Sequence, residues 1–179
     1  VLDACASPGG KTTALAAAMG AGKGLVACDI RDKRLSVLRR TLDAAGLRGV
    51  PLVQLDLRQA LPFRVQFDCV LVDAPCSGLG TLRRDPDIKW RCQPADLPAF
   101  AHSQQQMLRR AAAVVAPGGR LIYATCSSEP EENEAIAGDF VSTPGFRRLD
   151  ATPIHPDLPA AVIDAAGDLR TSPPRHGLE

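Results

Sequence analysis

The sequence lacks the features that mark membrane, secreted and zinc-binding proteins. No stretch approaches the roughly 20 apolar residues that a membrane-spanning helix needs, and the amino-terminal segment lacks the order of a signal peptide. No CxxC pair occurs, and the 3 histidines are too widely separated for ligand spacing. We therefore expect a cytoplasmic protein with no metal ion and no membrane partner.

The sequence also lacks an excess of charge of either sign. Its 179 residues include 21 Lys and Arg against 20 Asp and Glu, and a formal charge of +1 gives no general attraction to a polyanion. Any affinity for nucleic acid must therefore be local. The 6 cysteines are interpreted as thiols, because nothing marks the chain for secretion. A hydrophobic content of 45% suits one sizeable core, so we expect one domain, residues 1–179.

Short apolar runs alternate with amphipathic segments, and no internal repeat interrupts them. The candidate strands, each rich in Val, Leu or Ile, are residues 1–5, 24–30, 51–55, 67–73 and 120–125. Strands that are apolar on both faces are typical of a buried parallel sheet. The pattern predicts an α/β fold with a mostly parallel sheet and helices on both faces.

Helical spacing appears in three of the segments that follow strands. Residues 35–45 form one candidate helix that stops at Gly46, and residues 100–115 form a second that ends at Pro117. A third helix is expected after Ser128, where Ser128 and Glu131 have capping-box spacing. Residues 146–149 are expected to form a short strand. The proline-rich tail beyond residue 144 has no functional interpretation.

The first strand leads into a glycine-containing turn that opens a helix. The turn consists of Cys5, Ala6, Ser7, Pro8, Gly9, Gly10, Lys11 and Thr12. Glycines allow a ligand to approach the backbone, and amide groups at a helix start favour an electron-rich partner. A phosphate loop is excluded because Cys5 stands where GxxxxGK[ST] needs glycine, and GxGxxG is not matched either. Lys11 is either part of the site or a surface lysine at the helix start.

Two acidic residues follow the next strands and point to a ribose-bearing cofactor. Asp29 ends the second strand about 20 residues after the turn, where a ribose-binding acid belongs in dinucleotide folds. Asp56 also follows a strand, the third, and is predicted to lie near the adenine edge of the same cofactor. The alternatives are that Asp29 caps the next helix and that Asp56 is a solvated turn residue.

Two cysteines follow the last two strands of the predicted sheet. Cys76 comes three residues after Asp73, and Cys126 follows the fifth strand. Because parallel strands end at one edge, five strands are expected to deliver Gly9, Asp29, Asp56, Asp73, Cys76 and Cys126 to a single rim. Both cysteines have polar or glycine neighbours, which suits a reactive thiolate. Cys5, Cys28 and Cys69 are instead expected to be small buried side chains.

A basic segment surrounds the only tryptophan. Its members are Arg83, Arg84, Lys89, Trp90 and Arg91. This composition suits phosphate contacts with an aromatic ring available for stacking, which indicates a loop that faces RNA. The alternative is that Trp90 anchors the loop to the core while the charges are solvated.

Three of these segments together resemble the RNA cytosine-5 methyltransferases of the Nop2/Sun type. The segments are residues 3–12, where Ser7 replaces an expected alanine, residues 73–78 and residues 125–127. Residues 82–90 are similar to the corresponding loop of the bacterial Sun (Fmu, RsmB) enzymes, which modify small-subunit ribosomal RNA. The resemblance implies a Rossmann-like fold that binds S-adenosylmethionine through residues 5–11, Asp29, Asp56 and Asp73. It also implies an amino-terminal RNA-binding region and a last strand after residue 175, so we expect a chain truncated at both ends.

The resemblance implies that the thiolate of Cys126 attacks carbon 6 of cytosine, since carbon 5 is a poor nucleophile until the ring gains electron density. Cys76 then assists release as base, acid or positioning group. Asp73 either binds the base or seats the cofactor, and Lys11 lowers thiolate pKa values. The alternatives are a DNA cytosine-5 methyltransferase, in which Cys76 attacks, and an inactive cofactor- and RNA-binding module for ribosome assembly.

Overall fold

The computed structural model describes residues 1–20, 22–150, 157–171 and 176 of the chain. The resemblance places residues 175–179 just before a further strand. Of these residues only His176 is among the described ones, so this expectation lies outside the described part of the chain. Within the described ranges no helix is long and apolar enough to cross a membrane.

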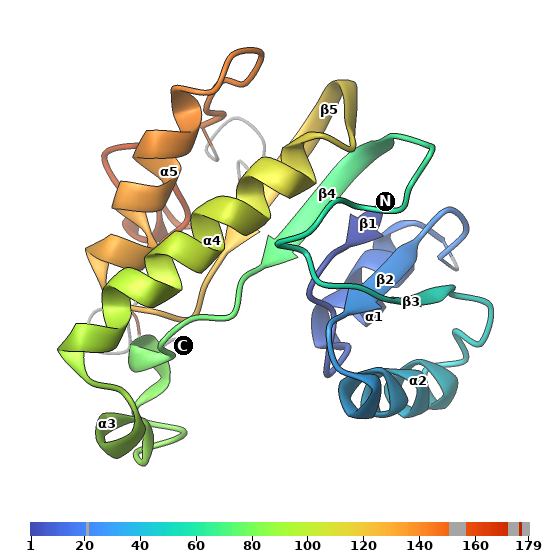
Figure 1. The fold of residues 1–179 in the computed structure, drawn as a ribbon, viewed down its shortest axis with the longest axis horizontal. Helices are drawn as coiled ribbons and strands as arrows, with labels where there is room; N and C mark the ends of the chain where they lie inside the picture. The colour runs from blue at the N-terminus through green and yellow to red at the C-terminus, as the bar shows by residue number, and fades with distance from the viewer. Residues whose placement is uncertain (21, 151–156, 172–175, 177–179) are drawn as a thin grey trace. The chain divides into compact units, whose positions relative to one another are not determined.

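A parallel sheet of five strands forms the centre of the fold (Figure 1). The strands are β1 (Leu2–Asp3), β2 (Val26–Asp29), β3 (Leu52–Gln54), β4 (Phe67–Asp73) and β5 (Val115–Ala124). Their order is β3-β2-β1-β4-β5, and every pair is parallel. All five predicted strands are therefore confirmed, as is the α/β fold class. β4 has the predicted bounds, whereas β1, β2 and β3 are shorter at their ends.

The start of β5 differs from the prediction. The preceding helix α4 (Leu97–Ala112) ends at Ala112, and Val115 pairs with Phe67 instead of continuing the helix. The register shifts between Phe67 and Cys69, which pairs with Arg120, and Gly118 in this irregular stretch of β5 has a φ of 76°. The helical spacing of Val115 was misleading, since a β-branched valine next to a strand edge is equally suited to the sheet.

Two helices follow the first two strands. They are α1 (Gly10–Ala18) and α2 (Asp32–Ala44), and Gly46 just beyond α2 has a φ of 75°, as its capping role predicts. Leu38 and Leu42 of α2 pack in one core cluster with Ala16 of α1. Connections from β1 to β3 run in one direction along the sheet, and the connection through α4 from β4 to β5 runs in the other. Because such crossovers are right-handed, α1 and α2 cover one face and α4 the opposite face.

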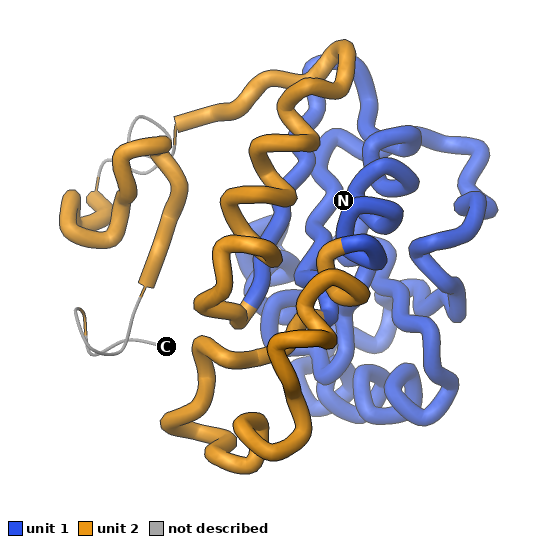
Figure 2. The backbone as a smooth tube through the Cα atoms, turned by 60° about the vertical axis from the view of Figure 1, so that its left-hand side comes forward, with its two compact units in different colours: residues 1–75, 102–125 blue, residues 76–101, 126–179 orange. Residues whose placement is uncertain are grey.

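The chain forms two compact units, which Figure 2 shows in different colours. Unit 1 contains residues 1–75 and 102–125, and therefore the whole sheet with α1, α2 and most of α4. Unit 2 contains residues 76–101 and 126–179. Its elements are the short helices α3 (Ile88–Arg91) and α5 (Glu134–Val141) and the 3-10 turns Leu79–Thr81, Pro94–Asp96, Pro130–Glu132 and Ala160–Val162. The prediction of one domain over residues 1–179 stays a prediction.

Two predictions for unit 2 need correction. The helix expected after Ser128 begins as the 3-10 turn Pro130–Glu132, and α5 starts at Glu134 with Asn133 as its amino-terminal cap. The Ser128 hydroxyl donates to the Glu129 side chain, so Ser128 and Glu131 form no capping box. Residues 146–149 form no strand, because they run as irregular chain without a partner strand.

Gly9 and Gly10 give a matched test of the turn before α1. Alanine at position 9 would sit at a φ of 113° with its Cβ 2.9 Å from Leu38 Cδ1, whereas alanine at position 10 meets no atom within 4 Å. We expect Gly9→Ala to lower the free energy of unfolding by about 1–3 kcal/mol. Gly10→Ala should leave it unchanged or raise it by about 0.4–1 kcal/mol. Urea denaturation of the ligand-free protein measures both, and equal effects would contradict this account of the turn.

Candidate active site

The turn between β1 and α1 forms one side of a pocket in unit 1. Gly9 caps α1 with left-handed backbone geometry, and Gly10 and Lys11 open the helix. The pocket has a volume of about 270 Å³ and is lined by Asp3, Cys5, Ala6, Pro8, Gly10, Lys11 and Asp73. It therefore lies at the carboxyl ends of β1 and β4, the edge where parallel sheets bind ligands.

Two of the predicted cofactor-binding residues 5–11, Ser7 and Gly9, do not line this pocket. The Ser7 N–H donates to Asp29 Oδ2 at 3.3 Å, and the Ser7 hydroxyl donates to the Arg34 carbonyl at 3.1 Å. Gly9 instead allows the turn to pass close to the side chains of Leu38 and Thr41. Ser7 and Gly9 therefore shape the turn, and any contact of theirs with a cofactor stays a prediction.

Asp29 is buried at the end of β2, with 4% of its surface exposed. Its Oδ1 accepts the N–H of Arg31, the cap residue of α2, at 3.2 Å, and its Oδ2 lies 3.2 Å from Arg34 Nε. The helix α2 itself has no side-chain cap hydrogen bond, and the Arg31 N–H precedes its first residue, so this contact does not decide between the capping alternative and a ribose contact. Asp29 also braces the cofactor turn through Ser7, and its ribose-binding role stays a prediction.

Asp56 follows β3 and lies near the end of the neighbouring strand β2, since the Leu55 N–H donates to the Asp29 carbonyl. Its carboxylate accepts from the Arg58 guanidinium at 2.7 Å. Hydrogen bonds from Arg58 lower the pKa of Asp56, so this carboxylate is charged at neutral pH. This contact does not test the prediction that Asp56 lies near the adenine of the cofactor.

Asp3 is the pocket residue that the sequence interpretation missed. It is fully buried; its Oδ2 accepts the Thr12 hydroxyl at 2.7 Å, and its Oδ1 has no hydrogen-bond partner. Burial raises the pKa of Asp3 to about 6, and the negative charge of Asp73 adds to the rise. A buried carboxylate oxygen without a donor favours a ligand with N–H groups or positive charge. The sequence held no clear signal, because Asp3 lies in the middle of the predicted strand 1–5 and only the structure ends β1 at this residue.

Lys11 and Asp73 face each other across the pocket. Lys11 Nζ lies 2.7 Å from Asp73 Oδ2, and the two side chains are 55% and 32% exposed. The ion pair joins the first turn of α1 to the end of β4. Lys11 is thus an exposed lysine at the start of α1 that also pairs with a pocket residue, and its part in the site stays a prediction.

A larger hollow of about 480 Å³ lies at the amino ends of the strands, near Val26 and Phe67. Among its lining residues only Lys23 and Asp68 carry ionisable side chains. It lies at the edge of the sheet opposite to Asp29 and Asp73. We therefore assign the chemistry of unit 1 to the smaller pocket. The described residues include no group of three or more His, Cys, Asp or Glu side chains arranged to hold a metal ion.

Unit 2 brings the two predicted catalytic cysteines together. The sulfur atoms of Cys76 and Cys126 are 3.2 Å apart, and the Cys126 N–H points to the Cys76 sulfur at 3.4 Å. Cys126 is exposed, and Cys76 is partly buried. The hydrogen bond with Cys126, together with burial, raises the pKa of Cys76 above its usual value. Cys76 therefore keeps its proton and can donate it to a Cys126 thiolate.

The other cysteines have different surroundings. Cys28 is fully buried, as expected, whereas Cys5 and Cys69 are partly buried. Burial raises the pKa values of Cys5 and Cys28 to about 12, so both stay protonated at neutral pH. Cys5 lines the pocket as a neutral thiol. The predicted role of Cys126 as the nucleophile stays a prediction.

The basic segment of unit 2 exposes its aromatic ring. Trp90 is 74% exposed in the short helix α3, so the alternative that it anchors the loop to the core is wrong. Lys89 Nζ lies 4.9 Å from the centre of the Trp90 ring, and the Arg91 guanidinium lies 2.6 Å from Asp85. An exposed indole beside cations is suited to stacking with an unpaired base.

Comparison with known proteins agrees with this arrangement. The family model described as "16S rRNA methyltransferase RsmB/F" matches residues 1–179. The ribosomal RNA small subunit methyltransferase F of Serratia proteamaculans is 38% identical over 100% of this chain and 38% of its own length. The ribosomal RNA small subunit methyltransferase B of Pseudomonas putida is 42% identical over 84% of this chain and 35% of its own length. The chain thus spans less than two fifths of either relative.

A solved structure supports the same relationship. The structure of NSun6 from Pyrococcus horikoshii with SFG is 31% identical, with a TM-score of 0.72 over 78% of this chain and 36% of that chain. These matches confirm the resemblance inferred from residues 3–12, 73–78 and 125–127. Because the family model covers the full length, the chain belongs to the 16S rRNA methyltransferase RsmB/F family.

Proposed function

We propose that this protein transfers a methyl group from S-adenosylmethionine to carbon 5 of a cytosine in RNA, with small-subunit ribosomal RNA as substrate. The contact of 3.2 Å between the sulfurs of Cys76 and Cys126 is the observation that carries the proposal. A methyltransferase that needs no covalent step has no use for two adjacent thiols. The names of the Serratia and Pseudomonas relatives support the RNA substrate.

The pocket in unit 1 suits the cofactor. S-adenosylmethionine carries positive charge on its sulfonium and amino groups, and when bound it supplies the methyl group. Asp3 and Asp73 line the pocket with Lys11, and Asp3 Oδ1 has no hydrogen-bond partner among the residues that the structure describes. The side chains of Asp3 and Asp73 therefore bind the cationic part, while Asp29 and Asp56 at the neighbouring strand ends hold the ribose and adenine.

Cys126 activates the base. Its thiolate adds to carbon 6 of the cytosine, and the electron pair of the carbon 5–carbon 6 double bond becomes available at carbon 5. After carbon 5 has gained the methyl group, its proton passes to a water molecule acting as base, the electron pair of the carbon–hydrogen bond restores the double bond, and the carbon–sulfur bond breaks with Cys126 leaving as the thiolate. The exposed position of Cys126 gives it access to a flipped base.

Cys76 controls the proton at this site. Its raised pKa keeps it protonated beside the attacking sulfur, so its S–H can donate a hydrogen bond to the Cys126 thiolate before attack and again when that sulfur departs. Asp73 lines the cofactor pocket, and its ion pair with Lys11 fixes the position of its carboxylate. Its carboxylate can bind the exocyclic amine of the base as well as seat the cofactor.

Alanine variants of the two thiols test the covalent mechanism. We expect Cys76→Ala to accumulate a protein–RNA complex that survives denaturing electrophoresis, because attack proceeds and release fails. Cys126→Ala should form no complex and transfer no methyl group, and Cys92→Ala should behave as wild type. The reverse pattern would make Cys76 the nucleophile, and full methylation by both variants would exclude covalent catalysis. Parallel assays with DNA distinguish the DNA methyltransferase alternative.

The basic segment is tested by the salt dependence of RNA binding. We expect Arg83→Ala with Arg84→Ala to weaken binding and to reduce the slope of log affinity against log salt by roughly 1.4, about 0.7 for each lost phosphate contact. Lys33→Ala with Arg40→Ala, on the exposed side of α2, removes the same charge elsewhere. An equal loss in both double variants would contradict a local contact.

Asp3 makes stability depend on pH. Its pKa is about 6 in the folded chain and near 3.8 when unfolded, so the folded state binds the proton more tightly. The free energy of unfolding should therefore fall by up to about 3 kcal/mol as the pH rises from 4 to above 6. Asp3→Asn keeps an acceptor for Thr12 and should remove this part of the dependence. Urea titrations at several pH values measure it, and identical pH slopes for both proteins would contradict the shifted pKa.

A further inference from the structure

We propose that Glu132 is a positioning residue that holds the two thiols in contact through Ser77 and Ser127. This inference rests on the proposed function, and it assigns a role to a residue that is hydrogen-bonded to Ser77, the residue after Cys76. Glu132 is fully buried in the 3-10 turn Pro130–Glu132 of unit 2. A buried carboxylate is costly unless its oxygens are hydrogen-bonded, so its partners indicate why it is there.

Both carboxylate oxygens of Glu132 are directed to the residue that follows Cys76. The Ser77 N–H donates to Glu132 Oε1 at 2.9 Å, and the Ser77 hydroxyl donates to Glu132 Oε2 at 2.5 Å. Glu132 thus fixes both the backbone and the side chain of Ser77. Because Ser77 is bonded to Cys76 in the chain, these contacts limit where the Cys76 thiol can point.

The same network reaches the residue that follows Cys126. The hydroxyls of Ser77 and Ser127 are 3.1 Å apart. Since the Ser77 hydroxyl gives its proton to Glu132, the Ser127 hydroxyl is the donor in this second bond. The Ser127 oxygen in turn accepts the Glu129 N–H at 3.1 Å. The Glu132 carboxylate therefore determines which hydroxyl donates in each of these hydrogen bonds. Through the two serines it connects the loop of Cys76 to the loop of Cys126.

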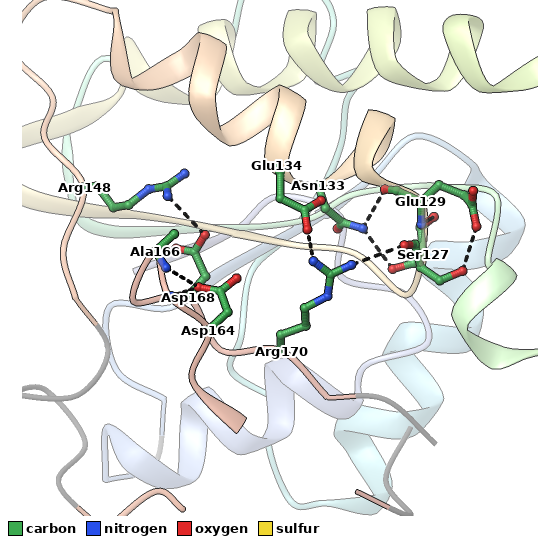
Figure 3. Close-up of polar contacts among 10 residues, drawn as sticks. Ser127, Glu129, Asn133, Glu134, Arg148, Asp164, Ala166, Asp168 and Arg170 are labelled. Carbon is green, nitrogen blue, oxygen red and sulfur yellow. Dashed lines mark hydrogen bonds and ion pairs between the residues drawn. The ribbon is translucent and has the colours of Figure 1, made fainter. Parts of the chain in front are cut away.

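Further contacts keep the second loop rigid. Asn133 Nδ2 donates to the carbonyls of Ser127 and Glu129 at 3.0 and 2.8 Å, and Figure 3 shows its side chain directed to both. Arg170 reaches the Ser128 carbonyl and forms an ion pair with Glu134 in the same view. Asn133 and Arg170 thus fix the loop that follows Cys126, and Glu132 connects this loop to the loop that contains Cys76.

The two loops also approach each other through a glycine. The Gly80 N–H donates to the Cys126 carbonyl at 3.0 Å. A side chain at position 80 would place its Cβ 2.7 Å from that same oxygen. The close approach of Gly80 to the Cys126 carbonyl therefore sets the distance between the two loops. The hydrogen bonds of Glu132 with Ser77, and of Ser77 with Ser127, hold the loops at this distance.

The chemical consequence concerns the release step. Cys76 must stay beside Cys126 so that it can hold a proton for the departing sulfur, whereas initial attack needs only the Cys126 thiolate. Loss of the Glu132 network should therefore slow release more than attack. A residue with a purely structural role would lower the amount of folded enzyme and leave this partition unchanged.

Glu132→Gln tests the proposal with little change in shape. The amide can still accept the Ser77 N–H, but its other end donates and conflicts with the Ser77 hydroxyl. We expect kcat to fall about ten- to a hundred-fold with little change in the KM for RNA, and the covalent protein–RNA complex to accumulate. Glu131→Gln, an exposed residue in the same turn, removes the same charge and should behave as wild type.

Each outcome separates this proposal from the proposed function. If the wild-type protein forms no 5-methylcytosine, the proposed function fails. If the wild type is active and Glu132→Gln matches Glu131→Gln in rate and adduct level, the role of Glu132 is contradicted. If Glu132→Gln does not fold, Ser77→Ala decides in the same assay: adduct accumulation supports the network, and wild-type rate and adduct level overturn it.

Discussion

The parallel pairing of β4 with β5 is the constraint on which the candidate chemistry depends. Asp73 is in register with Ala124, and the Ala74 N–H donates to the Ala124 carbonyl at 2.8 Å. The chain reaches Cys76 two residues after Ala74 and Cys126 two residues after Ala124. Two cysteines that are 50 positions apart thus leave neighbouring strands at the same level, and their sulfurs meet in unit 2. A shift of register would separate them.

The pocket in unit 1 and the thiols in unit 2 each contain a group whose pKa is raised. These groups are Asp3, which is buried, and Cys76, which is hydrogen-bonded to a second sulfur. Groups of this kind are common at functional sites. The apolar cluster around Leu38 and Leu42 contributes to the stability of unit 1.

The sequence was sufficient for features that depend on local pattern or on strand order. It predicted β4 to its bounds, the end of α2 before Gly46 and the meeting of Cys76 with Cys126, since parallel strands end at one edge. It failed where tertiary partners decide. Val115 joins the sheet because Phe67 offers it a strand partner, and Asp3 stood out only when its burial was known. In the sequence Glu132 is one of several acids among residues 129–134, and its burial and its contact with Ser77, 55 positions away, emerge only in the folded chain.

The central claim is that Cys126 forms a covalent bond to cytosine during methyl transfer. The most direct measurement uses the wild-type protein with S-adenosylmethionine and RNA in which 5-fluorocytidine replaces cytidine. Fluorine at carbon 5 removes the proton that must leave, so release is blocked after the methyl group has been added. The account predicts a stable complex whose protease-released peptide, identified by mass spectrometry, carries a methylated fluorocytosine on Cys126. A modified peptide containing Cys76 instead, or no complex while unmodified RNA is methylated normally, would contradict it.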